Sequence, residues 1–250
     1  MTDRRDVDRL AKMQAQLVAQ ALAKLTKYWN RLDLTNPGRA RDQLEVFVTE
    51  LVDTYGEPAA AAAAQWYEDL RIADTGDESF RATVADPSNR AAVAKATREA
   101  IDGLDSRSAD GVKGNLAGAV QRQISYMARA TVARNVKLDP KKPRFARVPQ
   151  GVHTCAFCEM LASRGWVYLS EDTAGLTHRF HRKCDCQIVP SWDRSHTHIE
   201  GYDPDAMYQR YLESVRSVGS DSGESAILID LRRRFPMRFT DGVVKRPEAS

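Results

Sequence analysis

Cysteine is scarce in this chain, and all of it lies in one short segment. Only four of the 250 residues are cysteine, at positions 155, 158, 184 and 186. A chain of this length can bury a substantial core without disulfides, so its stability does not require them. The clustering of the four thiols therefore needs an explanation other than disulfide stabilisation of a small domain.

Long apolar runs and a strong net charge are absent as well. No stretch approaches about eighteen consecutive apolar residues, and the start, MTDRRDVDRLAK, lacks the apolar core of a signal peptide. With 28% charged residues, the formal net charge is only +3, so charge alone does not indicate nonspecific nucleic-acid binding. We expect a soluble protein made in a reducing cytosol, where clustered cysteines more often bind metal or do redox chemistry than form disulfides.

Apolar residues spaced three or four apart predict a series of amphipathic helices in the first half of the chain. One stripe predicts a helix from Asp6 to Trp29, with a break near Asn36-Pro37-Gly38. A second stripe stops at Gly56, and Pro58 is expected to open the next helix, over the alanine-rich residues 59–74. Further helices are expected over 90–104 and 116–135, separated by a Ser-, Asp- and Gly-rich loop at 105–115.

The character of the sequence changes at residues 138–143, LDPKKP. The short segments RFARV, WVYL and CQIVP then have strand composition, AMYQRYLESV and ESAILIDLRRRF have helix composition, and a polar tail, TDGVVKRPEAS, is expected to be mobile. We therefore predict a mainly α fold with a small α+β domain. Its parts are a helical N-terminal region (1–137), an α+β Cys/His domain (138–200), and a helical C-terminal extension with a flexible tail (201–250).

The cysteine spacing favours a structural zinc site. Zinc takes four thiolate or imidazole ligands in a tetrahedron, and the Cys-x-x-Cys turn at 155–158 can direct two sulfurs at one ion. The second half of the site would come from Cys184-Asp-Cys186 and from His181, three residues earlier. Two ligand sets stay open, four cysteines or three cysteines with His181, and His178 is a ligand, a second-shell partner or a surface residue. The predicted metal ligands are Cys155, Cys158, His181, Cys184 and Cys186.

Other interpretations of the same residues are weaker. Reduced packing cysteines and a pair of disulfides remain alternatives to zinc. A thiol enzyme would need a cysteine activated by histidine, for which Cys155 with His181 is the plausible pair, but this leaves the other cysteines unexplained. The triplet His198-Ile-Glu200 follows the thiols, whereas a zinc deaminase places it before them. These enzyme interpretations are therefore weaker than a structural metal site.

A basic run near the C-terminus gives a secondary hypothesis. Arginine occupies positions 232, 233, 234 and 238, with Phe235 and Phe239 interleaved. Basic residues mixed with aromatic ones can contact DNA, although such a run is more often a solvated helix end. A zinc-dependent nucleic-acid-binding module, using Arg232, Arg233, Arg234 and Arg238, is thus an alternative function.

Two stretches carry a family resemblance. FARVPQGVHTCAFCEMLASRGWVYLS, followed by FHRKCDCQIVPSW, resembles the Mu F-like minor capsid proteins of tailed bacteriophages, also called head morphogenesis proteins, in the version found in phages of actinobacteria. In that family a Cys-x-x-Cys, a short helix and hairpin, and a His-x-x-Cys-x-Cys follow in this order. The resemblance covers residues 144–192, and this chain departs from the family pattern at Arg182 and Asp185.

The resemblance implies a structural role in the virion, and a protein that is not an enzyme. It implies a minor head component that is associated with the portal and acts in capsid assembly, and that in some members enters the cell with the DNA. The expected partners are the phage portal protein and the major capsid or scaffold protein, with no membrane segment. The expected location is the head interior or the portal vertex, after synthesis in the host cytoplasm.

Overall fold

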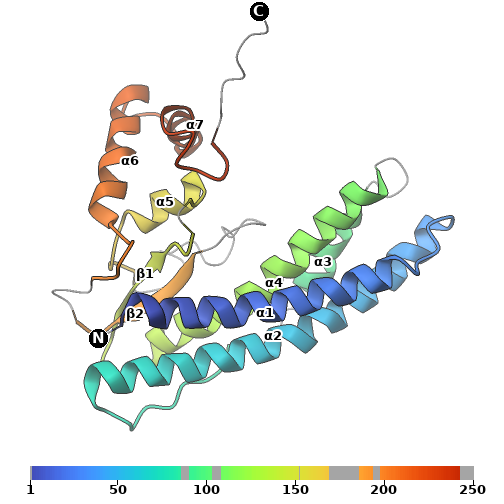
Figure 1. Cartoon of the computed structure of the whole chain (residues 1–250), viewed down its shortest axis with the longest axis horizontal. Coiled ribbons are helices and arrows are strands. Elements are labelled where there is room, and N and C mark those ends of the chain that lie inside the picture. Colours follow the sequence, from blue (N-terminus) through green and yellow to red (C-terminus); the bar gives the residue numbers. More distant parts are fainter. Residues whose placement is uncertain are drawn as a thin grey trace, which may run out of the picture.

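Seven helices and a two-stranded sheet make up the described part of the chain (Figure 1). This computed structural model describes residues 2–85, 90–102, 108–151, 153–168, 186–193 and 198–242. The prediction of a mainly α fold is confirmed. No helix in these ranges is long and apolar enough to cross a membrane.

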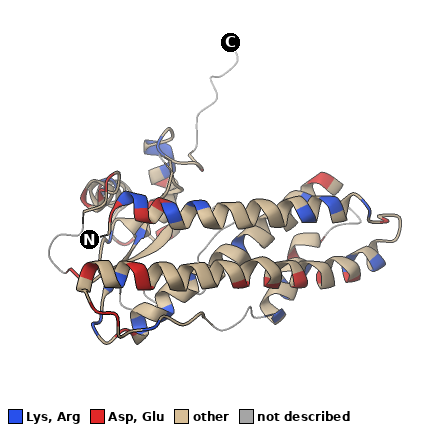
Figure 2. Cartoon of the chain, turned by 60° about the horizontal axis from the view of Figure 1, so that its bottom comes forward, with Lys and Arg blue, Asp and Glu red and all other residues tan. Residues whose placement is uncertain are grey.

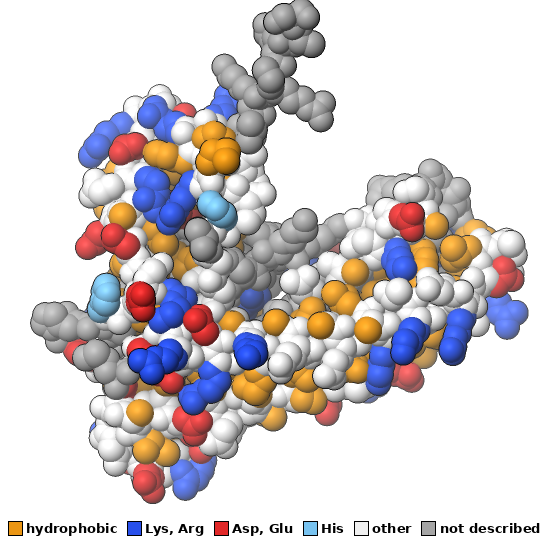
Figure 3. Space-filling view, in the orientation of Figure 1, with side chains coloured by type: hydrophobic (Ala, Val, Ile, Leu, Met, Phe, Trp, Pro, Cys, Tyr) orange, Lys and Arg blue, Asp and Glu red, His pale blue; other side chains and the backbone are white. Residues whose placement is uncertain are grey.

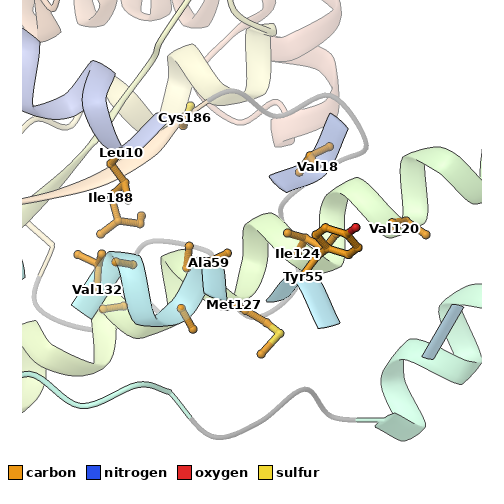
Figure 4. Close-up of a cluster of buried hydrophobic side chains, with 14 of the residues drawn as sticks. Leu10, Val18, Tyr55, Ala59, Val120, Ile124, Met127, Val132, Cys186 and Ile188 are labelled. Carbon is orange, nitrogen blue, oxygen red and sulfur yellow. The ribbon is translucent and has the colours of Figure 1, made fainter. Parts of the chain in front are cut away.

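Four helices pack side by side into an elongated body, which we call the helical layer: α1 (Arg4–Trp29), α2 (Pro37–Thr75), α3 (Arg90–Ile101) and α4 (Ala109–Leu138) (Figure 1). Each helix buries the stripe of apolar residues that its sequence period predicts. Figure 4 shows Leu10 of α1 beside Ile188 of the sheet, and Tyr55 of α2 close to Ile124 of α4. One continuous apolar core therefore links the helical layer to the sheet.

The predicted helix break at Gly56 and Pro58 is wrong, because α2 runs without interruption over 39 residues. Pro58 lies inside the helix, where it removes one backbone hydrogen bond. Pro58 and Glu57 lie on the exposed side of α2, whereas Tyr55 and Ala59 on its inner side are buried in the core, and this burial offsets the cost of the proline. Gly56 is a packing residue, since a Cβ placed there would lie 2.2 Å from Sδ of Met127.

The predicted loop at 105–115 is also partly wrong. Residues 103–107 lie outside the described ranges, but α4 already begins at Ala109. The hydroxyl of Ser108 accepts a hydrogen bond from the backbone N–H of Gly111 at 3.2 Å, which caps the helix. Val112 is fully buried and continues the apolar stripe of α4 in the N-terminal direction. The capping serine outweighs the two glycines of this segment.

The sheet pairs β1 (Arg144–Val148) with β2 (Gln187–Ser191) in antiparallel register, so that Phe145 lies opposite Pro190. These are the predicted strands RFARV and CQIVP. From the third predicted strand, Tyr168 forms one antiparallel bridge with Phe145, and Leu169 lies outside the described residues. The sheet packs against α4, and β2 also contacts α1.

Asp139 ties the helical layer to the sheet at the point where α4 ends. Its fully buried carboxylate accepts hydrogen bonds from Tyr67 Oη at 3.0 Å, Arg71 Nε at 3.0 Å and Trp192 Nε1 at 2.9 Å. Arg71, itself buried, also pairs with Asp77 at 2.8 Å. One carboxylate at the end of α4 therefore binds side chains from α2 and from the residue that follows β2.

The N-terminus of α1 reaches the second half of the molecule. The Arg4 guanidinium donates to the carbonyl of Glu200 at 2.7 Å and to that of Pro149 at 3.1 Å. Further along α1, buried Gln14 accepts a hydrogen bond from Gln187 at 3.1 Å. These contacts join residues that are more than one hundred positions apart in the sequence.

Three short helices complete the fold: α5 (Ala156–Ala162), α6 (Pro204–Val218) and α7 (Glu224–Arg234) (Figure 1). Helices α6 and α7 pack against each other and against α5. We call residues 204–242 the C-terminal unit. The predicted mobile tail starts too early, because the N–H of Thr240 donates to the carbonyl of Thr154 at 2.9 Å. Residues 243–250 lie outside the described ranges.

Candidate functional site

The Cys-x-x-Cys turn forms the N-terminus of α5. Cys155 is the N-cap residue, and its sulfur accepts a hydrogen bond from the backbone N–H of Cys158 at 3.1 Å. Both side chains are buried, and both belong to the main apolar core. The turn therefore brings two sulfurs to the same end of one short helix, on its inner side.

Cys186 lies in the same core, just before β2, and is fully buried (Figure 4). Its carbonyl accepts a hydrogen bond from Nε of Arg129 at 2.9 Å. A second buried guanidinium, that of Arg147, places Nη2 3.9 Å from Sγ of Cys158.

Three of the predicted ligands, Cys155, Cys158 and Cys186, are thus buried in the main apolar core, and no disulfide joins them. His181 and Cys184 lie outside the described residues, as does His178. Among the residues that are described, no three Cys, His, Asp or Glu side chains form a group that could hold a metal ion. The five-residue ligand set stays a prediction.

Two buried tyrosines hold the C-terminal end of α5. Tyr168 donates its hydroxyl to the carbonyl of Leu161 at 2.6 Å, and Tyr202 donates to that of Ala162 at 2.7 Å. Burial raises the pKa of Tyr168 to about 12 and also raises the pKa of Tyr202. Both phenols therefore stay protonated and act as donors at neutral pH. The cysteine pattern gave no signal for either residue.

The outer side of α5 is held by charged side chains. The carboxylate of Glu159 is almost fully buried and pairs with Arg210 of α6 at 2.5 Å and with Arg238 at 3.4 Å. Asp241 accepts a hydrogen bond from the N–H of Ala156 at 3.0 Å and pairs with Arg232 of α7 at 2.7 Å. Glu159 of α5 and Asp241, after α7, thus form ion pairs with three arginines of the C-terminal unit.

These contacts change the interpretation of the basic run at 232–238. Arg232 pairs with Asp241, Arg238 with Glu159, and Arg234 with Asp230 at 2.7 Å on the same helix. Arg233 is exposed. Three of the four arginines therefore contribute to the fold, so the run is a poorer candidate for a DNA-binding surface than its sequence indicates.

Comparisons with known proteins identify the family. Residues 1–214 match the family described as "VG15 protein", and the chain belongs to this family. Among its relatives is the "Gene 15 protein" of Mycobacterium phage D29, 28% identical over 138 residues, or 42% of this chain and 48% of the relative. The "Gene 15 protein" of Mycobacterium phage L5 is 30% identical over 117 residues, or 31% of this chain and 40% of the relative.

These matches indicate a phage protein of an actinobacteriophage. Each alignment covers less than half of the length of the relative. No solved structure matches the chain.

Proposed function

We propose that the protein is a structural minor head component of a tailed phage, bound at the portal and not an enzyme. The observation that carries this proposal is the Cys-x-x-Cys turn on α5 followed by buried Cys186 before β2, in a chain of the phage VG15 family. This order of elements is the one in which the sequence resembles the Mu F-like minor capsid proteins.

The helical layer supports a role as an assembly surface. Helix α2 has 39 residues and is therefore about 58 Å long. Most of its alanines, at positions 59, 60, 63 and 64, are buried against the neighbouring helices, so the length of α2 and not its alanine-rich part is what favours this role. Long helices of this kind can bridge two subunits of a larger assembly, such as a portal ring and the surrounding shell or scaffold.

A pull-down tests the proposed partner. Tagged protein, coexpressed with the portal, major capsid and scaffold proteins of the same phage, should retain the portal protein through a high-salt wash. A matched charge variant, Arg233→Gln, alters an exposed side chain away from the helical layer and should bind equally well. Recovery of none of the three head proteins, together with absence of the chain from purified virions, would argue against the proposal.

We further propose a zinc ion as the structural cofactor of the thiol segment. The Cys155–Cys158 turn suits one half of such a site, because it presents two buried sulfurs at the start of a helix. The other half would be Cys184 and Cys186, with His181 as the alternative fourth ligand. A bound ion would join the start of α5 to the residues before β2 and stabilise this small region.

Elemental analysis tests the metal directly. The purified protein should carry about one zinc per chain. The Cys155→Ser variant should lose most of the metal, while Ser163→Ala, on the same helix, should keep it. Freely titratable thiols in a folded protein without bound zinc would rule out the cofactor.

A second candidate function, DNA binding, is favoured by α1 and not by the basic run at 232–238. No acidic residue occurs between Arg9 and Asn30, and Lys12, Lys24 and Lys27 are all exposed. In the described part of the chain no ion pair neutralises these three lysines. Figure 2 shows basic residues towards both ends of α1, and Figure 3 shows basic side chains along the body.

Gel-shift titration with duplex DNA separates this candidate from a purely structural role. Changing Lys12, Lys24 and Lys27 to glutamine should weaken binding and reduce the salt-dependence slope by about 1 for each lysine that contacts a phosphate. Arg233→Gln serves as the control for the basic run. If the intact chain does not bind DNA at low salt, this candidate is dismissed.

A further inference from the structure

Helix α5 lies between two separate apolar cores. Its inner residues, Cys155, Cys158 and Ala162, belong to the main core with the helical layer and the sheet. Its outer residues Ala156, Met160 and Leu161 belong to a second core, formed with α7 and Phe239. Both sides of this seven-residue helix are thus buried: the inner side by the main core, and the outer side by the C-terminal unit.

The segment after α7 binds the start of α5 through backbone hydrogen bonds. Phe239 and Thr154 form a parallel bridge, and the N–H of Thr240 donates to the carbonyl of Thr154 at 2.9 Å. Asp241 then caps the first turn through the N–H of Ala156 at 3.0 Å. Three consecutive residues, Phe239, Thr240 and Asp241, therefore fix the two positions on either side of Cys155.

Ion pairs on the outer side of α5 add to these backbone contacts. Glu159, one residue after Cys158, is 2% exposed and receives Arg210 and Arg238 on its two oxygens. Asp241 is held in turn by Arg232. The side chains of Arg238 and Asp241 remain 43% and 36% exposed. Partly exposed ion pairs of this kind are weak, and they break without disruption of a core.

We propose that the C-terminal unit is a latch that positions the Cys-x-x-Cys turn through its contacts with Thr154 and Ala156. Loss of these contacts frees the first turn of α5 to open locally, and this local opening makes the inward-facing Cys155 and Cys158 accessible. Asp241 is the positioning residue, since it connects the cap of α5 to α7. The latch concerns the thiol site of the proposed function and rests on that assignment, but it requires neither a bound metal nor the portal. It gives a partner that binds α6 or α7 a way to open the thiol site.

Cysteine alkylation tests the latch. The full-length protein is treated with N-ethylmaleimide under native conditions, as purified and after dialysis against EDTA, and the rate at each cysteine is followed by peptide mass spectrometry. The test variant combines Asp241→Ala with Arg238→Gln. The control, Asp230→Ala, breaks the Arg234 pair, which joins two residues of α7 and does not involve α5.

The latch predicts that Cys155 and Cys158 react about tenfold faster in the test variant, while Cys186 and the unfolding midpoint change little. The control should react at the wild-type rate. Asp241→Asn keeps an oxygen for the N–H of Ala156, so it should stay closer to wild type than Asp241→Ala.

Two results would overturn the latch: unchanged rates in the test variant, or a uniform rise at all three cysteines with a lowered unfolding midpoint, which indicates global loosening. The metal assignment fails separately. If EDTA has no effect on any alkylation rate but the test variant still reacts faster, the latch is supported and the zinc site is rejected. If EDTA accelerates alkylation of the wild type but the test variant reacts no faster than the wild type, the zinc site is supported and the latch is rejected.

Discussion

The helical layer and the region around α5 are held together in different ways. In the helical layer, long apolar stripes meet over many turns, and the alanines of α2 let its neighbours approach closely. Around α5 the elements are short, and buried tyrosines and acidic side chains fix their ends. The first region depends on the fit of apolar surfaces, whereas the second depends on a few individual polar atoms. Single substitutions should therefore act differently in the two regions.

The largest effect is expected at Asp139, where the two regions meet. Asp139→Ala leaves the buried Arg71 guanidinium and the Tyr67 hydroxyl without this acceptor, which should cost about 3–5 kcal/mol of unfolding free energy. Urea denaturation measures the loss. Asp77→Ala removes the other carboxylate from Arg71, but Asp77 is 30% exposed, so it should cost clearly less than Asp139→Ala. Equal losses in the two variants would show that Asp139 does not link the regions.

Alkaline pH should weaken the contacts around α5. Burial raises the pKa of Tyr168 from its ordinary value of 10.0 to about 12, so its stabilising contribution is complete below pH 10 and is lost as the pH rises towards 12. A pKa change of this size corresponds to roughly 3 kcal/mol of unfolding free energy.

The unfolding midpoint in urea at pH 9 and at pH 11 measures this loss. Tyr168→Phe should be less stable at pH 9 but should lose less stability between the two pH values. An identical pH dependence in wild type and variant would contradict the assignment.

A glycine tests the fit of the helical layer. Gly56→Ala introduces a Cβ that overlaps Sδ of Met127, so it should destabilise by about 1–2 kcal/mol despite the higher helix propensity of alanine. At Gly114 of α4 no atom lies within 4 Å of the added Cβ, so Gly114→Ala should stabilise by about 0.5–1 kcal/mol.

Thermal unfolding with Met127→Ala, alone and combined with Gly56→Ala, completes a double-mutant cycle. The two losses should sum to more than the loss in the double variant, because removal of the Met127 side chain relieves the overlap. Additive losses would mean that α2 and α4 are not in close contact at Gly56.

The same contrast explains which features the sequence predicts. Periodic apolar residues predicted α1, α3 and most of α4, because a stripe is repeated over several turns. The uninterrupted α2 was missed, since Gly56 and Pro58 are locally unfavourable and only the burial against α4 compensates for them. The Cys-x-x-Cys turn was found from its spacing, whereas Tyr202, Arg210 and Asp241 contact α5 from positions that no local pattern connects to it.

The contacts of Arg4 and Gln14 have a consequence for the order in which the chain folds during synthesis. Helix α1 leaves the ribosome before the other described elements, but its N-terminal turn binds the carbonyl of Glu200, and Gln14 binds Gln187. Synthesis must reach residue 200 before both bonds can form. Helix α1 is therefore made before its contacts are complete, and until then its apolar stripe depends on α2 and α4 for cover.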